Sequence, residues 1–177
     1  IEDLNLASKL EYHMQPLRIS LFYPASLLRQ LAAEIINQEP GEQYELIPDI
    51  GPELEGYQME GDERLIMRAV GNLLNNSIRH NPSGCRICLS ARQKDGGLRI
   101  SVKDDGCGIG DGIIRYLTEE PSREKEDTGK GEVYGETFLE GEGPHIMGLR
   151  IVKQIVLAHK GVFRIQEKGH EVCLWFP

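Results

Sequence analysis

Residues 68–81 read R-A-V-G-N-L-L-N-N-S-I-R-H-N, and this stretch decides how the fold is interpreted. Its apolar residues recur three and four positions apart, which predicts a helix with one buried face. These residues are Val70, Leu73, Leu74 and Ile78. Pro82 follows the stretch and disfavours helical backbone before it, so the helix is predicted to end there.

The polar residues of the same stretch have a spacing of their own. Asn72 and Asn76 are four positions apart, which places their Cβ atoms about 5–6 Å apart on adjacent turns. Arg79 and His80 follow them. An Asn carbonyl can ligate Mg²⁺ without adding negative charge, and Arg or His can contact phosphate oxygens. The row therefore fits a metal-bound polyphosphate, although a surface helix with scattered amides would show the same residues.

Size and charge limit the classes of function. A chain of 177 residues is long enough for one domain with some additional chain. The net charge of −8 and the pI near 5.2 argue against general nucleic-acid or anionic-membrane binding, so a phosphate site must be a local positive patch. No apolar run is long enough to span a bilayer, and no secretory signal opens the chain.

The four cysteines show no repeated pairing, which indicates reduced thiols and a cytoplasmic location. Cys85 and Cys88 form a single C-x-x-C with no second pair and no nearby His. We interpret them as two strand residues rather than as zinc ligands.

The chain before residue 68 alternates between predicted helices and strands. Residues 1–14 place apolar side chains near one helical face, and Pro16 stops this helix. Because the helix has no N-terminal cap, it is predicted to be the tail of a longer element. Asp62 is the predicted N-cap of the helix that contains residues 68–81. Between them we predict a strand at 18–23, a helix from Pro24 to Asn37, and short strands at 44–47 and 57–59.

A second motif follows a predicted hairpin. Residues 86–93 and 98–102 alternate apolar and polar side chains around the turn signal D-G-G. The return strand runs into D-D-G-C-G-I, which begins at Asp104. A strand that ends in D-x-G-x-G holds one carboxylate in place, and its glycines, Gly106 and Gly108, let the backbone approach a ligand. Such a carboxylate can accept a hydrogen bond from the exocyclic amine of adenine, although an ordinary acidic turn is the alternative.

Residues 119–142 differ in character from the rest of the chain. Nine acidic and three basic residues mix with four glycines, with almost no apolar periodicity. The segment is predicted to be a mobile loop, which is either a solvated insertion or a lid over a site. The next helix is predicted to start near Met147 and to end at Gly161. Gly148 near its start would let a phosphate approach the free N–H groups of the helix N-terminus.

Two strands, at 162–165 and 172–176, end the chain. The predicted order of elements places helices on one face of a mixed sheet. The fold class is therefore predicted to be α+β, a two-layer α/β sandwich with a sheet of about five strands and three helices on one face.

Taken together and in this order, the motifs resemble the catalytic ATP-binding domain of two-component sensor histidine kinases, which has the Bergerat ATP-binding fold. The motifs are N-x-x-x-N, D-x-G-x-G, and a Gly-rich segment that runs into M-G-L-R-I-V-K-Q-I. The resemblance covers residues 19–177. The opening L-N-L-A-S-K-L-E-Y also resembles the end of the helical dimerisation domain of that family. This implies a boundary between residues 1–16 and a catalytic domain at 17–177, with a lid at about 119–146.

The resemblance implies ATP and Mg²⁺ as cofactors and suggests a role for each matching residue. Asn76 would hold Mg²⁺, and Asn72, Arg79 and His80 would surround the phosphates and the metal. The other implied nucleotide-binding residues are Asp104 at the adenine amine, Gly106, Gly108 and Ile109 beside it, and Gly148 and Leu149 at the phosphate side.

The sequence departs from the family pattern at two places. Ile146 stands where the family usually has a second glycine, two residues before Gly148, which implies a stiffer lid hinge. The aromatic F-x-x-F segment after D-x-G-x-G is missing. Its packing is predicted to come from Ile113, Ile114, Tyr116 and Leu117.

The residue at position 72 distinguishes a kinase from a hydrolase. Related ATPases of this fold carry a Glu there as the general base for water, whereas Asn72 has no basic carboxylate. A kinase needs mainly positioning and charge neutralisation. The family's phosphoacceptor His precedes an acidic residue within a helix, and none of the five His residues fits this pattern. The acceptor is therefore expected upstream of residue 1.

The favoured function is thus the catalytic domain of a protein-histidine kinase, with phosphate relayed from the upstream domain to a response regulator. The full-length protein is expected to form a homodimer and can be anchored in a membrane. No nucleic acid and no membrane contact are expected for this segment. The alternatives are a nucleotide-binding pseudokinase or regulatory module without transfer activity, and a relative of the fold that serves only protein contacts.

Overall fold

The computed structural model describes residues 6, 9, 16–38, 40–118 and 139–177, with only the backbone for 139–145. The predicted helix at 1–14, apart from Leu6 and Lys9, lies outside the described residues, as do residues 119–138 of the predicted loop at 119–142. In chain order, the elements are β1 (Ser20–Phe22), α2 (Pro24–Asn37), β2 (Tyr44–Ile50), η1 (Pro52–Leu54), β3 (Met59–Gly61), α3 (Glu63–His80), β4 (Cys85–Lys94), β5 (Gly97–Asp104), α4 (Asp111–Thr118), α5 (Leu139–Ala158), β6 (Val162–Gln166), η2 (Glu167–Gly169) and β7 (Glu171–Phe176).

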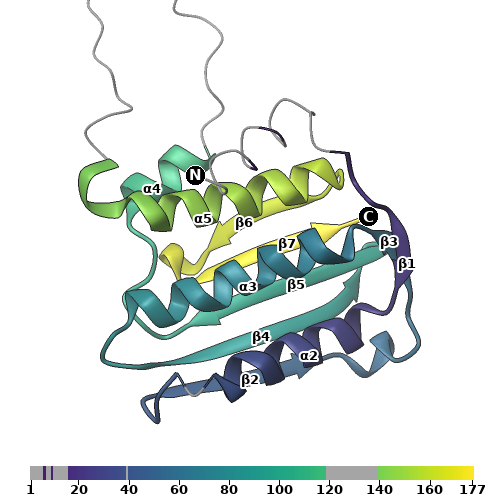
Figure 1. Ribbon diagram of the computed structural model, residues 1–177, viewed down its shortest axis with the longest axis horizontal. Helices are drawn as coiled ribbons and strands as arrows, with labels where there is room; N and C mark the ends of the chain where they lie inside the picture. Colours follow the sequence, from purple (N-terminus) through teal and green to yellow (C-terminus); the bar gives the residue numbers. More distant parts are fainter. Residues whose placement is uncertain (1–5, 7–8, 10–15, 39, 119–138) are drawn as a thin grey trace, which may run out of the picture.

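These elements form a two-layer α+β sandwich, in which α2, α3 and α5 cover one face of a five-stranded sheet (Figure 1). The strand order is β2-β4-β5-β7-β6, with β2 parallel to β4 and every other pair antiparallel. Strands β1 and β3 pair separately in a small antiparallel sheet. The predicted fold class is confirmed. Among the described helices, none combines the length and the apolar composition needed to cross a membrane.

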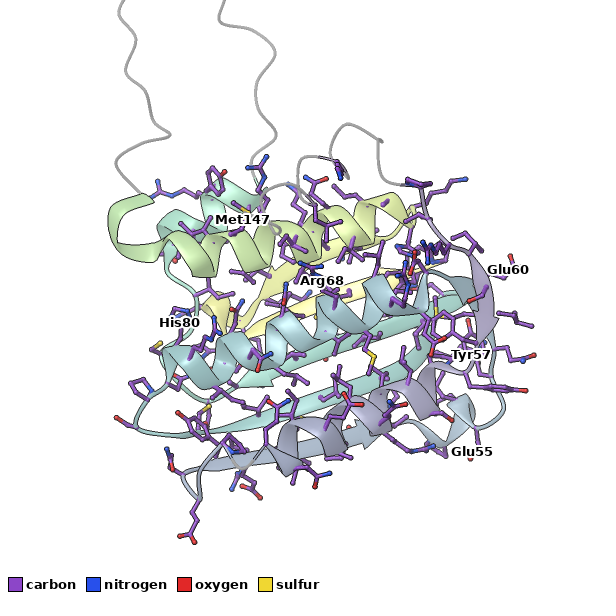
Figure 2. The ribbon with its side chains drawn as sticks, in the orientation of Figure 1. Glu55, Tyr57, Glu60, Arg68, His80 and Met147 are labelled. Atoms are coloured by element: carbon purple, nitrogen blue, oxygen red, sulfur yellow. The ribbon has the colours of Figure 1, made fainter. Side chains whose placement is uncertain are left out.

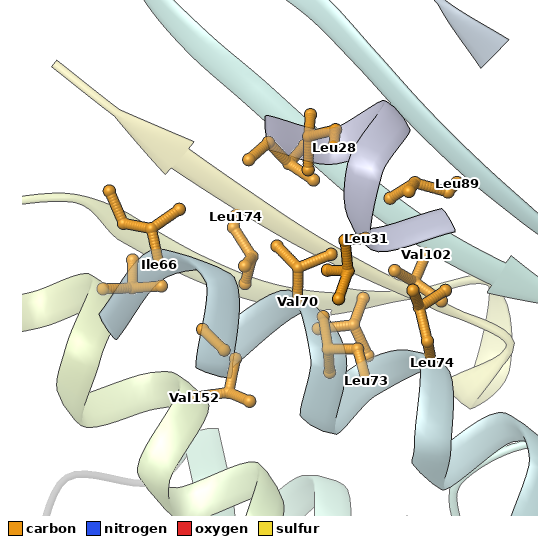
Figure 3. Packing of buried hydrophobic residues seen from close by; sticks show 14 of the residues in the cluster. Leu28, Leu31, Ile66, Val70, Leu73, Leu74, Leu89, Val102, Val152 and Leu174 are labelled. Atoms are coloured by element: carbon orange, nitrogen blue, oxygen red, sulfur yellow. The ribbon is translucent and has the colours of Figure 1, made fainter. Parts of the chain in front are cut away.

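Helix α3 lies at the centre of the helical layer and begins at a well-formed cap. The Asp62 side chain accepts a hydrogen bond from the Leu65 backbone N–H at 3.2 Å, as predicted for an N-cap. Val70, Leu73 and Leu74 from its buried face pack between the sheet, α2 and α5 (Figure 3). Burial of each Leu side chain is worth about 1.5–3 kcal/mol. This packing fixes the helix, and therefore its polar residues, relative to the sheet.

The register of the β4–β5 hairpin determines where the D-x-G-x-G motif follows the end of β5. Asp95 and Gly96 form its turn with φ values of 54° and 77°. Two consecutive positive φ values define the type I′ turn, which matches the twist of the strands and favours Asp-Gly. The resulting register pairs Leu89 with Val102 in the core and Ile87 with Asp104 at the end of β5.

Two helical segments differ from the prediction. Helix α5 begins at Leu139 rather than near Met147, so the end of the predicted lid is helical. The extension runs through Gly141, Gly143 and Pro144, which are poor helix formers, so local propensity does not account for it. Helix α4 was not predicted. It buries Ile113 and Leu117 against α5. The prediction that Tyr116 packs with them is wrong, because this side chain is 56% exposed.

The end of α5 also differs from the expected glycine cap. The residue in the left-handed conformation is Lys160, with φ of 59°, and not Gly161. Gly161 has another role, since a Cβ there would lie 2.3 Å from the Trp175 carbonyl oxygen. A glycine is therefore required by the close approach of β7 rather than by backbone conformation.

Candidate functional site

A pocket opens where the carboxyl end of α3 meets the loop that follows β5. It encloses about 400 Å³, including the open solvent at its mouth. Six of the ten predicted site residues line it, namely Asn76, His80, Asp104, Gly108, Ile109 and Leu149. The other lining residues are Leu73, Ser77, Asn81, Val102, Cys107, Gly169, His170 and Val172.

Asp104 presents a half-buried carboxylate to this pocket from the end of β5. Its Oδ2 accepts a hydrogen bond from the Ser77 hydroxyl at 2.7 Å, and its Oδ1 accepts one from the Gly106 backbone N–H at 3.0 Å. An ionised carboxylate offers about four acceptor positions in total. Each oxygen therefore keeps the capacity to accept a further hydrogen bond from a ligand.

Asn81 ties the loop after Asp104 to α3. Its Nδ2 donates to the Ser77 carbonyl at 2.8 Å, and its Oδ1 accepts from the Cys107 backbone N–H at 2.8 Å. The side chain is only 7% exposed. A Cβ at Gly106 would lie 1.9 Å from the Asn81 Oδ1 atom, so only glycine fits there. The first glycine of D-x-G-x-G thus makes room for this clamp.

The second glycine of the motif faces the turn between β6 and β7. Gly108 has φ of 71°, and a Cβ there would lie 3.1 Å from the His170 ring. The Ile109 N–H donates to the Gly169 carbonyl at 3.0 Å, and the Asp104 N–H donates to the His170 carbonyl at 3.0 Å. The motif is therefore held from two sides, by α3 and by the β6–β7 turn.

Asn76 supplies the other polar end of the pocket. Its Nδ2 is buried and has no hydrogen-bond partner among the described residues. A buried polar group without a partner costs about 1–3 kcal/mol, so this amide is suited to receive a polar ligand. Gly148 lies beside it, since a Cβ there would be 3.6 Å from the Asn76 Oδ1 atom. Figure 2 shows His80 at the carboxyl end of α3 and Met147, next to Gly148, on α5.

Two cysteines beside the site differ in their surroundings. Burial, and after it the nearby carboxylates of Asp104 and Asp105, raise the pKa of the Cys85 thiol to about 11. Cys85 is therefore a protonated packing residue at neutral pH. Cys107 is exposed, and its thiol contacts the His80 carbonyl at 3.4 Å.

The pocket lies within the part of the chain that matches a known family. Residues 61–177 match the family described as histidine kinase-, DNA gyrase B- and HSP90-like ATPase. The chain belongs to this family. The resemblance inferred from the three motifs is thereby confirmed, and the pocket lies where these motifs meet.

Several relatives of this chain are sensor kinases. The chain is 33% identical over 110 residues to the sensor-like histidine kinase SenX3 of Mycolicibacterium smegmatis, covering 62% of this chain and 26% of SenX3. It is 34% identical over 127 residues to the sensor protein SphS of Synechococcus elongatus, covering 69% of this chain and 28% of SphS. The chain thus spans about a quarter of the length of these relatives.

Solved structures of histidine kinases share the fold. Acinetobacter baumannii AdeS superposes with a TM-score of 0.66 at 19% identity, covering 98% of this chain and 73% of AdeS. The nucleotide-free catalytic domain of ThkA gives 0.66 at 18% identity, covering 90% of this chain and 95% of that domain. Full-length ShkA in complex with AMPPNP gives 0.70 at 21% identity, covering 98% of this chain and 34% of ShkA. Similarity at this level of identity establishes the ATPase-family fold.

Not all predicted site residues of this ATPase-family domain lie in the pocket lining. Asn72 is half-buried one turn before Asn76, and Arg79 is exposed. Gly148 lies in the interior of α5 rather than near its start, so the prediction that it stands at a helix N-terminus is wrong. Sequence reasoning missed Ser77 and Asn81, which brace Asp104 and its loop.

His170 was also missed, and its Nδ1 is buried without a hydrogen-bond partner among the described residues. The available signal was its position directly after Gly169, in the turn before the last strand.

Proposed function

We propose that this chain is the catalytic domain of a sensor histidine kinase. It binds ATP with Mg²⁺ and transfers the γ-phosphoryl group to a His on a helical domain upstream. The observation that carries the proposal is the pair of polar ends in one pocket, namely the braced carboxylate of Asp104 and the buried Nδ2 of Asn76, which has no partner among the described residues. The family and the sensor-kinase relatives support it.

The residues of the pocket fit a purine nucleotide with a metal ion. Asp104 accepts a hydrogen bond from the adenine amine, with Gly108 and Ile109 along the base. Asn76 would hold Mg²⁺ through its amide oxygen, and its buried Nδ2, which has no hydrogen-bond partner among the described residues, would donate to a phosphate oxygen. Arg79 and His80 lie on the following turn of α3 and would contact phosphate oxygens. When bound, ATP supplies the phosphoryl group and Mg²⁺ neutralises charge on its oxygens.

Position 72 favours transfer to a side chain over hydrolysis. Asn72 precedes Asn76 by one turn of α3 and carries an amide, which cannot accept a proton from water as a carboxylate does. Phosphoryl transfer to an imidazole needs positioning and charge neutralisation more than a protein base. The chain's own residues therefore orient the nucleotide, and the acceptor His comes from another domain.

The longer relatives suggest what accompanies this domain. We infer that residues 1–16 are the end of a helical dimerisation and phosphoacceptor domain, that residues 17–177 are the catalytic domain, and that a lid lies at about 119–146. The full-length protein would then act as a homodimer and pass phosphate to a response regulator. The domain works in the cytoplasm, whether or not the parent protein is anchored in a membrane.

The adenine role of Asp104 is tested by comparing Mg-ATP with Mg-GTP in calorimetric titrations of this chain. GTP carries an oxygen where ATP carries the amine. The guanine oxygen and the Asp104 carboxylate are both acceptors, so no hydrogen bond could form between them. An acceptor that loses water to the ligand and gains no donor costs about 1–3 kcal/mol, so we expect ATP to bind at least about tenfold more tightly.

The matched pair of variants is Asp104→Asn and Asp105→Asn, because Asp105 is the exposed neighbour in the same loop. Asp104→Asn should lose the preference for ATP, and Asp105→Asn should keep it. Equal affinity of the unmodified chain for the two nucleotides would contradict the assignment.

A further inference from the structure

Ser77 stands between the two polar ends of the pocket. It follows Asn76 directly on α3, and it is 6% exposed. Its hydroxyl donates to the Asp104 Oδ2 atom at 2.7 Å, because a carboxylate can only accept. One turn of α3 therefore serves both ends of the pocket, with the amide of Asn76 at one and the hydroxyl of Ser77 at the other.

The backbone of Ser77 is fixed as firmly as its side chain. The Ser77 carbonyl accepts hydrogen bonds from the Asn81 Nδ2 atom at 2.8 Å and from the Cys85 thiol at 3.6 Å. The Oδ1 atom of the same Asn81 holds the Cys107 N–H in the loop after Asp104. The turn that carries the Ser77 hydroxyl therefore cannot shift relative to that loop without loss of these bonds.

The Asp104 carboxylate is consequently oriented by two donors from two elements. Ser77 on α3 holds Oδ2, and the Gly106 N–H in the loop holds Oδ1. Rotation of the carboxylate about its last side-chain bond would break at least one of these hydrogen bonds. The remaining acceptor positions of Asp104 thus point in fixed directions.

We propose that Ser77 is a positioning residue for base recognition, which holds the Asp104 carboxylate in the orientation that accepts an adenine amine and opposes a guanine oxygen. The proposal rests on the adenine role of Asp104. With Ser77 present, the carboxylate cannot turn away from the oxygen of guanine. Without the hydroxyl, the carboxylate relaxes, so ATP loses a fixed acceptor and GTP meets less repulsion. The ratio of ATP affinity to GTP affinity then falls, because ATP binds more weakly and GTP binds more tightly.

The test measures dissociation constants of Mg-ATP and Mg-GTP for four proteins by calorimetric titration. They are the unmodified chain, Ser77→Ala, Ser77→Thr and Ser101→Ala. Ser101 is the matched control, because it is buried on β5, three residues before Asp104, and does not line the pocket. Alanine has the highest helix propensity, so Ser77→Ala suits α3. The loss of one oriented hydrogen bond should reduce the ATP:GTP preference about fivefold in Ser77→Ala.

Ser77→Thr keeps a hydroxyl and should retain most of the preference, and Ser101→Ala should retain all of it. A merely structural role of Ser77 would weaken both nucleotides equally and leave their ratio unchanged, which would overturn the inference but not the proposed function. An equal change of the ratio in Ser101→Ala would also overturn it. If the unmodified chain bound no nucleotide, or bound both equally, the adenine assignment itself would fail and the inference with it.

Discussion

At the scale of single residues, Asn76 gives the sharpest test of the metal site. Asn76→Asp replaces the amide, whose Nδ2 has no partner among the described residues, by a carboxylate beside the proposed polyphosphate site. Like charges about 4 Å apart repel by about 1 kcal/mol in water and by more in a partly buried site, so we expect Mg-ATP affinity to fall about tenfold or more. Calorimetric titration measures the change.

The control for this substitution is Asn75→Asp, which makes the same chemical change at the exposed neighbouring position of α3. It should leave nucleotide affinity unchanged. If Asn76→Asp also bound Mg-ATP as tightly as the unmodified chain, and transferred phosphate normally in the full-length kinase, Asn76 would not be the metal-binding residue.

Single-residue patterns predicted the groups that would face a ligand better than the groups that hold them. Asp104 and Asn76 belong to short motifs whose chemistry is visible in the sequence. Ser77 and Asn81 act through contacts with residues 27 and 26 positions away. No local spacing encodes those contacts, because they exist only once α3 packs against the sheet.

At the scale of elements, α5 changes the interpretation of Ile146. The sequence suggested that this residue stiffens a lid hinge, but it lies within α5 and its side chain is only 7% exposed in the core. Ile146→Gly removes a buried side chain and places glycine in a helix, so we expect the free energy of unfolding to fall by about 3 kcal/mol or more. Urea denaturation measures the loss.

Ile36→Gly provides the comparison, because Ile36 lies on α2 and is 50% exposed. Ile36→Gly should lower the free energy of unfolding by at most about 1 kcal/mol, because only the difference in helix propensity contributes. If the two variants were equally stable and Ile146→Gly bound ATP more tightly, the core-packing role would be wrong and Ile146 would be interpreted as a lid hinge.

Elements with strong local signals were predicted well, and those set by packing were not. Asp62 caps α3 as expected, and the D-G-G signal gives the β4–β5 turn. By contrast, α4 depends on the burial of Ile113 and Leu117 against α5, and the start of α5 at Leu139 falls in a stretch with glycines and a proline that carries no local helix signal. Lys160 takes the left-handed position of the cap that ends α5, in which the Gly161 N–H donates to the Val156 carbonyl at 2.9 Å.

At the scale of the whole molecule, the site exists only because distant segments meet. The central strand β5 delivers Asp104 to the sheet end at which α3 ends and the β6–β7 turn lies. Each of these elements contributes polar groups to one pocket, which no single segment could form. The predicted order of elements was sufficient to place them in two layers, but the precise contacts required the packed fold.

The whole chain should bind ATP without labelling itself. Its described His residues are poor acceptors. Both ring nitrogens of His159 are engaged, since Nδ1 bonds the Ile155 carbonyl at 2.7 Å and Nε2 accepts the Asp62 N–H at 2.9 Å. His80 and His170 line the nucleotide pocket itself, and neither precedes an acidic residue within a helix. His13 and His145 also lack such a neighbour in the sequence.

Incubation with radiolabelled ATP should therefore give bound nucleotide but no stable phosphohistidine. ATP turnover should be slow, because Asn72 offers no base for water. A longer chain that includes the upstream helical domain should become labelled on that domain. Phosphate on any of the five His residues of this chain would contradict an upstream acceptor. A longer chain that binds ATP and never becomes labelled would instead indicate a regulatory module that uses the same pocket without transfer.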